Sequence, residues 1–189
     1  MKKFALVVLC VAFGTLAQAQ MRWYNFEEAI ELCKKQPKRI FIDVYTDWCG
    51  WCKVMDKNTF GHPDIAAYMN KDYYSVKLNA EMYDTVTFED HKFVNEGGGR
   101  RSTHQLAASL LNGKMSYPSV VFMEYKDGKF QLLHVLPGYQ TPEQFAPYMV
   151  YLGEGRYEKQ SWEDFNKTFK WKNSQKQEVA ATPAPAKKK

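Results

Sequence analysis

Two cysteines separated by two residues, Cys49 and Cys52, directly follow a strand-like run over residues 40–45. The residues after the pair, 53–57, favour a helix. A Cys-x-x-Cys at such a strand-to-helix junction is typical of a reactive dithiol. Cys49 would then lie at the helix N-terminus, where unpaired backbone N–H groups and the helix dipole favour a thiolate, the nucleophile of disulfide exchange. The pattern therefore predicts that Cys49 attacks a disulfide and that Cys52, one turn further in, resolves the product.

The first 19 residues have the pattern of a secretory signal peptide. Residues 2–3 are basic, residues 4–16 are apolar, and residues 17–19 fit a small-x-small cleavage site. We expect cleavage before Gln20, a periplasmic or secreted protein, and no stable membrane insertion afterwards. An uncleaved anchor is the alternative, but the apolar stretch is short against the roughly 20 residues needed to span a bilayer.

The rest of the sequence predicts one domain over residues 20–172 and a disordered Lys/Ala/Pro tail over residues 173–189. The formal charge of +5 is misleading, because two Lys lie in the leader and five in the last 18 residues. Residues 20–171 hold 19 basic and 20 acidic side chains, a net charge of −1. This nearly neutral body argues against a nucleic-acid partner.

Three cysteines remain after the leader, so one is left over from a single pair. Two cysteines so close together close only a short loop, and we therefore favour a redox pair over a structural disulfide. Half of a zinc site is a further alternative, but zinc normally takes four ligands and the chain has no second Cys-x-x-Cys, so we predict no metal. Cys33 falls on the apolar face of a predicted helix, which favours an inert core cysteine over a regulatory or resolving thiol.

Helical and strand-like patterns alternate along the chain. Asp127-Gly128 marks a tight hairpin turn between the last two strands, and the order of elements implies a mixed sheet with helices on both faces. Helices are predicted over residues 25–35, 50–57, 63–68, 88–95, 103–111, 141–152 and 162–171, and strands over residues 40–45, 73–78, 119–125 and 130–136.

Motifs spread along the chain match the thioredoxin superfamily in order and spacing: a strand with Asp43, the Trp48–Lys53 junction, the strand end 76–79, Tyr117-Pro118-Ser119 before an apolar strand, and Gly138. Over roughly residues 22–152 the chain resembles the secreted bacterial thioredoxin-related proteins with a Cys-Gly-Trp-Cys centre. The resemblance implies an α/β thioredoxin fold with a central mixed sheet of four to five strands flanked by helices. It also implies a helical insertion before the cis-proline strand and an extra C-terminal helix.

Asp43 interrupts an otherwise apolar strand, six positions before Cys49. A carboxylate buried there should have a raised pKa, which suits a proton acceptor near neutrality. The resemblance implies that this Asp takes the proton of Cys52, whereas the alternative is a strand-end Asp that faces solvent. Lys77 matches a family lysine near this Asp, although it also fits an ordinary strand lysine.

Around the sulfurs, the resemblance implies a cis Tyr117–Pro118 bond that lies against the dithiol and leaves the Tyr117 backbone free to pair with an extended substrate. A trans turn proline is the alternative. Exposed Trp48 and Trp51 would form an apolar platform for polypeptide substrates. Gly50 and Trp51 form the inner dipeptide, which influences redox poise, and Trp51 departs from the Pro or His common at that place in the family.

These observations predict an exported thiol–disulfide oxidoreductase without a cofactor, which reduces or exchanges the disulfides of proteins or peptides. Family resemblance implies a membrane-bound thiol as the electron donor. The alternative is a client-binding or chaperone-like module with little redox turnover. The segment 81–116 is longer than in minimal thioredoxins, and we hypothesise that it selects partners. Its run at residues 97–101 favours a flexible loop over a phosphate cradle.

Overall fold

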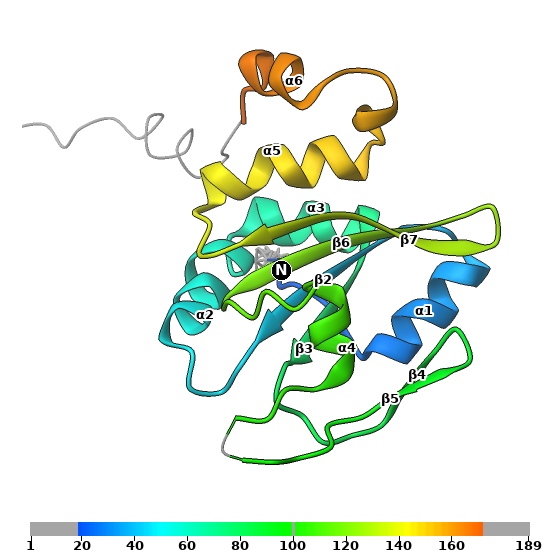
Figure 1. Ribbon diagram of the computed structural model, residues 1–189. Coiled ribbons are helices and arrows are strands. Elements are labelled where there is room, and N and C mark those ends of the chain that lie inside the picture. The colour runs from blue at the N-terminus through cyan, green and yellow to red at the C-terminus, as the bar shows by residue number, and fades with distance from the viewer. Residues whose placement is uncertain (1–18, 100, 172–189) are drawn as a thin grey trace, which may run out of the picture.

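The computed structural model describes residues 19–99 and 101–171, and it contains the predicted mixed sheet flanked by helices (Figure 1). The five strands lie in the order β1-β3-β2-β6-β7, in which β1, β3 and β2 are parallel and β6 and β7 are antiparallel. Their bounds are β1 Trp23–Tyr24, β2 Arg39–Tyr45, β3 Tyr73–Asn79, β6 Ser119–Lys126 and β7 Lys129–Pro137. The predicted tail and all of the predicted leader except Ala19 lie outside the described residues.

Helices cover both faces of this sheet (Figure 1). They are α1 Phe26–Lys35, α2 Gly50–Met55, a π-helical turn Asp56–Phe60, α3 Pro63–Asp72, α4 Gln105–Leu110, α5 Pro142–Gly153, a 3₁₀ turn Arg156–Glu158 and α6 Trp162–Thr168. Within the described ranges, no helix is both long and apolar enough to cross a membrane.

The central strand β2 is buried on both sides because its alternating side chains enter two different cores. Ile40 and Ile42 pack in the core that α1 and α4 cover. Phe41 packs in the other core, with α3 and α5. Asp43 is two residues after Phe41 on the same strand, so it lies on the same face as Phe41.

Helix α1 forms where its sequence pattern predicts it. Asn25 caps it, since its side-chain Oδ1 accepts a hydrogen bond from the Glu28 backbone N–H at 2.7 Å. Cys33 is a free cysteine and fully buried on the inner face, as predicted, and its Sγ donates to the Lys38 carbonyl at 2.9 Å. Burial raises the pKa of the Cys33 thiol, which keeps it protonated.

The helix predicted over residues 88–95 is wrong. The chain instead forms a two-stranded hairpin, β4 Val86–Phe88 and β5 His91–Phe93. Glu89 and Asp90, at the turn, have positive φ angles of 48° and 63°, which end any helix. Phe88 packs edge-on against Phe26 of α1, with ring centroids 5.3 Å apart, and this contact stabilises the hairpin.

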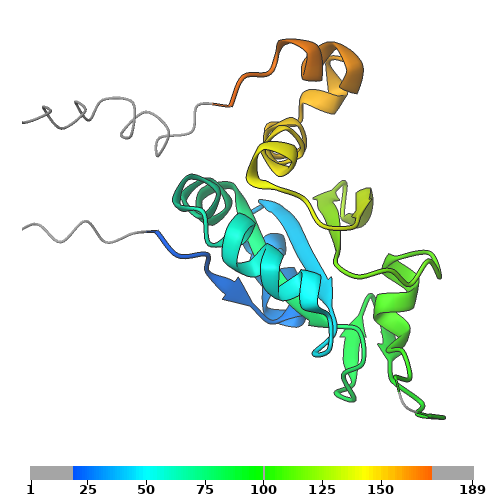
Figure 2. The same cartoon turned by 90° about the vertical axis from the view of Figure 1, so that its left-hand side faces the viewer.

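The C-terminal half follows the predicted pattern. The β6–β7 hairpin turns at Asp127 and Gly128, whose φ angles are 52° and 80°. Thr141 caps α5 and Pro142 is its first residue. Figure 2 shows α5 between the sheet and α6, while the β4–β5 hairpin lies at the opposite side of the molecule.

Candidate active site

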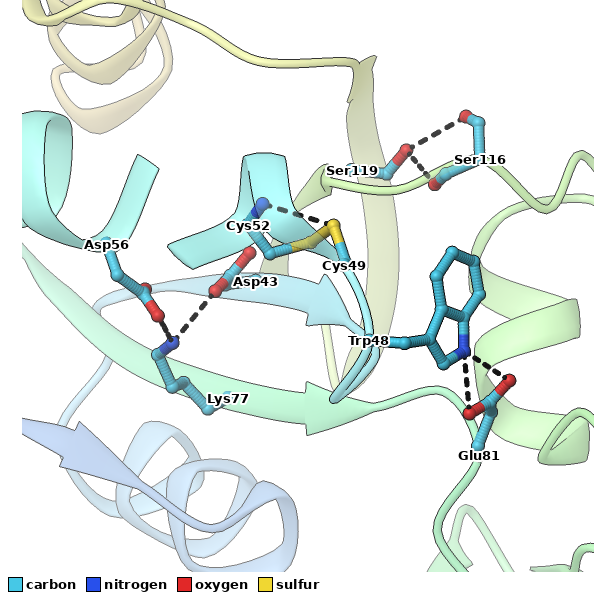
Figure 3. Close-up of a disulfide and its surroundings, with 9 residues drawn as sticks. All are labelled: Asp43, Trp48, Cys49, Cys52, Asp56, Lys77, Glu81, Ser116 and Ser119. Carbon is cyan, nitrogen blue, oxygen red and sulfur yellow. Dashed lines mark hydrogen bonds and ion pairs between the residues drawn. A yellow bond between two sulfur atoms is a disulfide. The ribbon is translucent and has the colours of Figure 1, made fainter. Parts of the chain in front are cut away.

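The two cysteines of the Cys-x-x-Cys motif form a disulfide at the start of α2 (Figure 3). Cys49 is the N-cap residue of α2, and its Sγ accepts a hydrogen bond from the Cys52 backbone N–H at 3.1 Å. Cys49 is 5% exposed and Cys52 is 3% exposed. The predicted contrast between an accessible and a shielded cysteine is therefore absent from the residue exposures of this oxidised state.

Asp43 is a buried carboxylate, only 1% exposed, so it does not face solvent. In Figure 3 it lies between the disulfide and Lys77. Neither of its oxygens accepts a hydrogen bond, although the Lys77 Nζ is 3.3 Å from Oδ2. Burial raises the pKa of Asp43 to about 7, because the cost of removing the charged form from water exceeds the attraction of Lys77.

Lys77 lies between two carboxylates, and the second, Asp56, was not predicted from the sequence. The Lys77 Nζ donates to both oxygens of Asp56 at 2.5 Å. Two aromatic rings also face the ammonium, with Trp23 at 5.2 Å and Tyr45 at 4.9 Å from the ring centroids. Burial lowers the pKa of Lys77, but the charge of Asp43 and the hydrogen bonds of Asp56 more than compensate and hold it above its usual value.

Trp48 is held by the segment between β3 and β6 and is 49% exposed. Its Nε1 donates to the two carboxylate oxygens of Glu81 at 2.9 and 3.0 Å (Figure 3). The guanidinium of Arg101 lies 4.3 Å from the centroid of its ring. Tyr117 packs edge-on against the same ring at 6.0 Å. Sequence reasoning missed Glu81 and Arg101, because each lies more than 30 residues from Trp48 in the chain.

The remaining predicted site residues are Trp51, Gly50 and the Tyr117–Pro118 pair. Trp51 is 62% exposed and its ring is 5.4 Å from that of Tyr139. The Tyr117–Pro118 peptide bond is cis, as the resemblance implied, and the Pro118 carbonyl accepts a hydrogen bond from the Gly138 N–H at 2.7 Å. Gly50 is exposed, and a Cβ there would meet no atom within 4 Å, so local packing does not require glycine.

Across the described part of the chain, no three His, Cys, Asp or Glu side chains form a group that could hold a metal ion. The chemically distinctive groups are a disulfide, a buried carboxylate beside it, and an ammonium shared by two carboxylates. Together with the sheet order and the cis-proline, they define a thioredoxin-fold protein with a redox-type dicysteine centre.

Comparison with known families agrees with this class. Residues 14–145 match the Thioredox_DsbH family, described as a protein of unknown function, DUF255, and the chain belongs to that family. Among solved structures, a thioredoxin from Thermus thermophilus superimposes with a TM-score of 0.53 at 17% identity, covering 75% of this chain and 99% of that one. A structure described as DsbH oxidoreductase gives a TM-score of 0.52 at 16% identity, covering 74% and 89% of the two chains. These likenesses show the thioredoxin fold.

Curated relatives match over shorter stretches. Human spermatogenesis-associated protein 20 is 32% identical over 81 residues, which are 41% of this chain and 10% of that protein. The thiol:disulfide interchange protein DsbD of Pseudoalteromonas atlantica is 28% identical over 68 residues, 35% of this chain and 12% of that protein. The match thus spans about a tenth of the length of either relative.

Proposed function

We propose that this protein is an exported thiol–disulfide oxidoreductase that reduces or exchanges protein disulfides through Cys49 and Cys52. The observation that supports the proposal best is the disulfide at the N-terminus of α2 with the buried carboxylate of Asp43 beside it. A structural disulfide needs no proton acceptor, whereas a dithiol that cycles between two redox states does. The similarity to part of a DsbD thiol:disulfide interchange protein supports the same chemistry.

In the first step of the proposed reduction, the Cys49 thiolate attacks one sulfur of a substrate disulfide. A bond forms between Cys49 and that sulfur, the substrate S–S bond breaks, and the departing sulfur leaves as a thiolate that takes a proton from water. Before the attack, the backbone N–H of Cys52 and the dipole of α2 stabilise the Cys49 thiolate.

In the second step, Cys52 loses its proton to Asp43 and attacks the sulfur of Cys49. The Cys49–Cys52 disulfide forms and the second substrate thiol leaves, so two electrons pass from the enzyme to the substrate. Asp43 suits this role because its raised pKa lets it take and release a proton near neutrality. A thiol donor then returns two electrons to the pair.

The exposed aromatic side chains support a polypeptide substrate. Trp48 and Trp51, which flank Cys49 and Cys52 in the sequence, present exposed apolar rings, and Tyr117 contacts the Trp48 ring. A substrate segment that lies on these rings would bring its disulfide to Cys49. The backbone of Tyr117, next to the cis-proline, would pair with that segment in extended form.

Export and the donor form part of the proposal. The basic, apolar and small-residue pattern of residues 1–19 supports a cleaved signal peptide and a periplasmic or secreted location. In that compartment a membrane-bound thiol protein would supply the electrons. The partial match to DsbD, a thiol:disulfide interchange protein, supports thiol–disulfide exchange with another protein.

Insulin reduction with dithiothreitol as electron source tests the activity. We expect the full-length mature protein to accelerate precipitation of the insulin B chain, and Cys49→Ser to fall to the rate of dithiothreitol alone. Cys33→Ala is the matched control, since it removes a buried thiol outside the pair and should retain the wild-type rate. Equal rates for wild type and Cys49→Ser would overturn the proposal.

A client-binding module with little redox turnover is the second candidate, favoured by the exposed rings of Trp48 and Trp51. The two functions differ in what Cys52→Ser does. An oxidoreductase lacking its resolving thiol accumulates a mixed disulfide with its substrate, which non-reducing electrophoresis detects. A pure binding module would retain the substrate without any covalent adduct.

A further inference from the structure

Lys77 is positioned asymmetrically between the two carboxylates that flank it. Its Nζ donates to both oxygens of Asp56 at 2.5 Å, but it is 3.3 Å from the nearer oxygen of Asp43 and donates no hydrogen bond to it. Figure 3 shows Asp43 on the side of the disulfide and Asp56 on the other side of the ammonium. The main partner of Lys77 is therefore Asp56.

The different exposures of the two carboxylates explain this preference. The Asp56 side chain is 39% exposed, whereas Asp43 is almost fully buried. Asp56 and Lys77 line a surface cavity of about 440 Å³ together with the segment 19–21. An ammonium that pairs with a partly solvated carboxylate keeps some of its hydration, whereas pairing deep in the core would require it to lose more water.

Few charged groups act on Asp43. Lys77 reaches it from β3, and Asp56 reaches the same ammonium from the start of the π-helical turn that follows α2. Val120 lies opposite Asp43 on β6 and carries no charge, and the rings of Trp23 and Tyr45 face Lys77. The ionisation of Asp43 therefore depends on how closely Lys77 approaches it.

We propose that Asp56 is a positioning residue for the redox reaction: it holds the Lys77 ammonium away from Asp43, so that Asp43 can both accept and release the proton of Cys52. The inference rests on the proposed function and deepens it. The ammonium is already 3.3 Å from Asp43, and without Asp56 it would move closer, donate a hydrogen bond to that carboxylate and keep it ionised. An Asp43 so paired would be a weaker base toward the Cys52 thiol.

The negative charge of Asp56 also favours the protonated form of Asp43, as does its hold on Lys77. Burial raises the pKa of Asp43 most, Lys77 lowers it, and the negative charge of Asp56 raises it again. Asp56→Asn preserves the shape of the side chain but removes both the repulsion of Asp43 and the strong hold on Lys77. Both changes favour an ionised Asp43.

Titration of Asp43 in the oxidised, full-length mature protein tests the proposal. The carboxyl carbon-13 chemical shift of Asp43, assigned by its loss in Asp43→Asn, would be followed against pH. We expect Asp56→Asn to lower the midpoint by about one pH unit and Lys77→Met to raise it, since nearby charges shift carboxyl pKa values by about this much or more. Asp47→Asn, which removes an exposed acid two residues before Cys49, should leave the midpoint unchanged.

A double variant separates positioning from simple repulsion. If Asp56 acts through Lys77, the shift caused by Asp56→Asn should shrink to less than half when Lys77 is already Met. An undiminished shift in the double variant, or no downward shift in Asp56→Asn alone, would overturn the proposal. A shift of the same size in Asp47→Asn would also overturn it.

This titration requires no substrate and no turnover, so its outcome is independent of the insulin assay. If Cys49→Ser retained full insulin reduction, the proposed function would fail while the effect of Asp56 on Asp43 could still be measured. If insulin reduction depends on Cys49, then Asp56→Asn should also change the rate of insulin reduction. The acidic limb of its pH profile should move to lower pH in Asp56→Asn, but not in Asp47→Asn.

Discussion

At the scale of single residues, Asp43 determines much of what the site can do. Its carboxylate lies in the core that also contains Phe41, where an ionised group is poorly solvated. The folded protein therefore favours the protonated form of Asp43, whereas the unfolded chain has it ionised above about pH 4. This difference links the stability of the protein to pH.

Burial raises the pKa of Asp43 from 3.8 to about 7, so its contribution to stability is fully present below pH 3.8 and is lost as the pH rises through 7. The resulting penalty above pH 7 is about 4 kcal/mol. Asp43→Asn cannot ionise, and we expect it to stabilise the oxidised protein progressively from pH 4 to pH 7, with a constant gain above. Urea unfolding at pH 5 and pH 8 would measure this, with Asp47→Asn as control. A gain of equal size at both pH values would contradict the prediction.

Asp43 and Asp56 show how far sequence reasoning reaches. Asp43 was predicted as a buried acid because it interrupts an apolar strand. Asp56 carries no such signal, since an acid on the polar side of a helix is normally solvated. Its position four residues after Cys52 places both on one helical face, but only the fold brings Lys77 of β3 to it.

At the scale of elements, the segment between β3 and β6 forms one side of the site. Asn95 ties this segment together, since its Nδ2 donates to the carbonyl of Ser102 at 2.9 Å and to that of Glu81 at 3.4 Å. Glu81 in turn binds the indole N–H of Trp48. The segment therefore fixes the orientation of one ring of the proposed substrate platform.

Glu81→Ala should weaken binding of a protein substrate without affecting the chemistry at sulfur. We expect the KM for insulin to rise about threefold, because a hydrogen bond on a half-exposed ring contributes about 0.5–1 kcal/mol. Glu81→Gln retains a carbonyl acceptor for the Trp48 N–H, so its KM for insulin should stay close to the wild-type value. Turnover of a small-molecule disulfide should stay at the wild-type rate, and an equal loss on both substrates would refute this role.

The same segment contains the clearest error of sequence reasoning. The turn of the β4–β5 hairpin is formed by Glu89 and Asp90, not by the glycine or asparagine that usually marks positive φ angles. Without that turn signal, the sequence favours a helix over residues 88–95. The Asp127-Gly128 turn contains that glycine, and its hairpin was predicted correctly.

At the scale of the whole molecule, the sheet and the site follow from motifs that lie in a fixed order along the chain. The dicysteine junction, the strand before it and the cis-proline strand are predictable because each has a local pattern. The cavity beside Lys77 cannot be predicted from the sequence, because it forms only where the segment 19–21 meets residues far along the chain. Such long-range contacts leave no periodic signal in the sequence.

The C-terminal helix α6 contributes to stability and lies apart from the disulfide, on the outer side of α5 (Figure 1). Phe165 is its buried anchor and packs against Tyr151 with ring centroids 5.1 Å apart. Phe165→Ala should lower the free energy of unfolding by about 3 kcal/mol and leave insulin reduction by the folded protein unchanged. Phe169→Ala, at a half-buried phenylalanine nearby, should lower the free energy of unfolding by a smaller amount. Loss of insulin reduction in folded Phe165→Ala would contradict this separation.

The burial of Cys33 has a consequence for an oxidising environment. If the leader with Cys10 is cleaved as proposed, Cys33 is the one cysteine outside the Cys49–Cys52 pair, and such an extra cysteine ordinarily invites scrambled pairing and covalent dimers. Cys33 is fully buried on the inner face of α1 and its thiol donates a hydrogen bond to a backbone carbonyl, so an attacking sulfur cannot reach it without local unfolding. Under the proposed function, Cys49 and Cys52 would therefore form an isolated two-electron switch that can cycle repeatedly without acquiring a wrong crosslink.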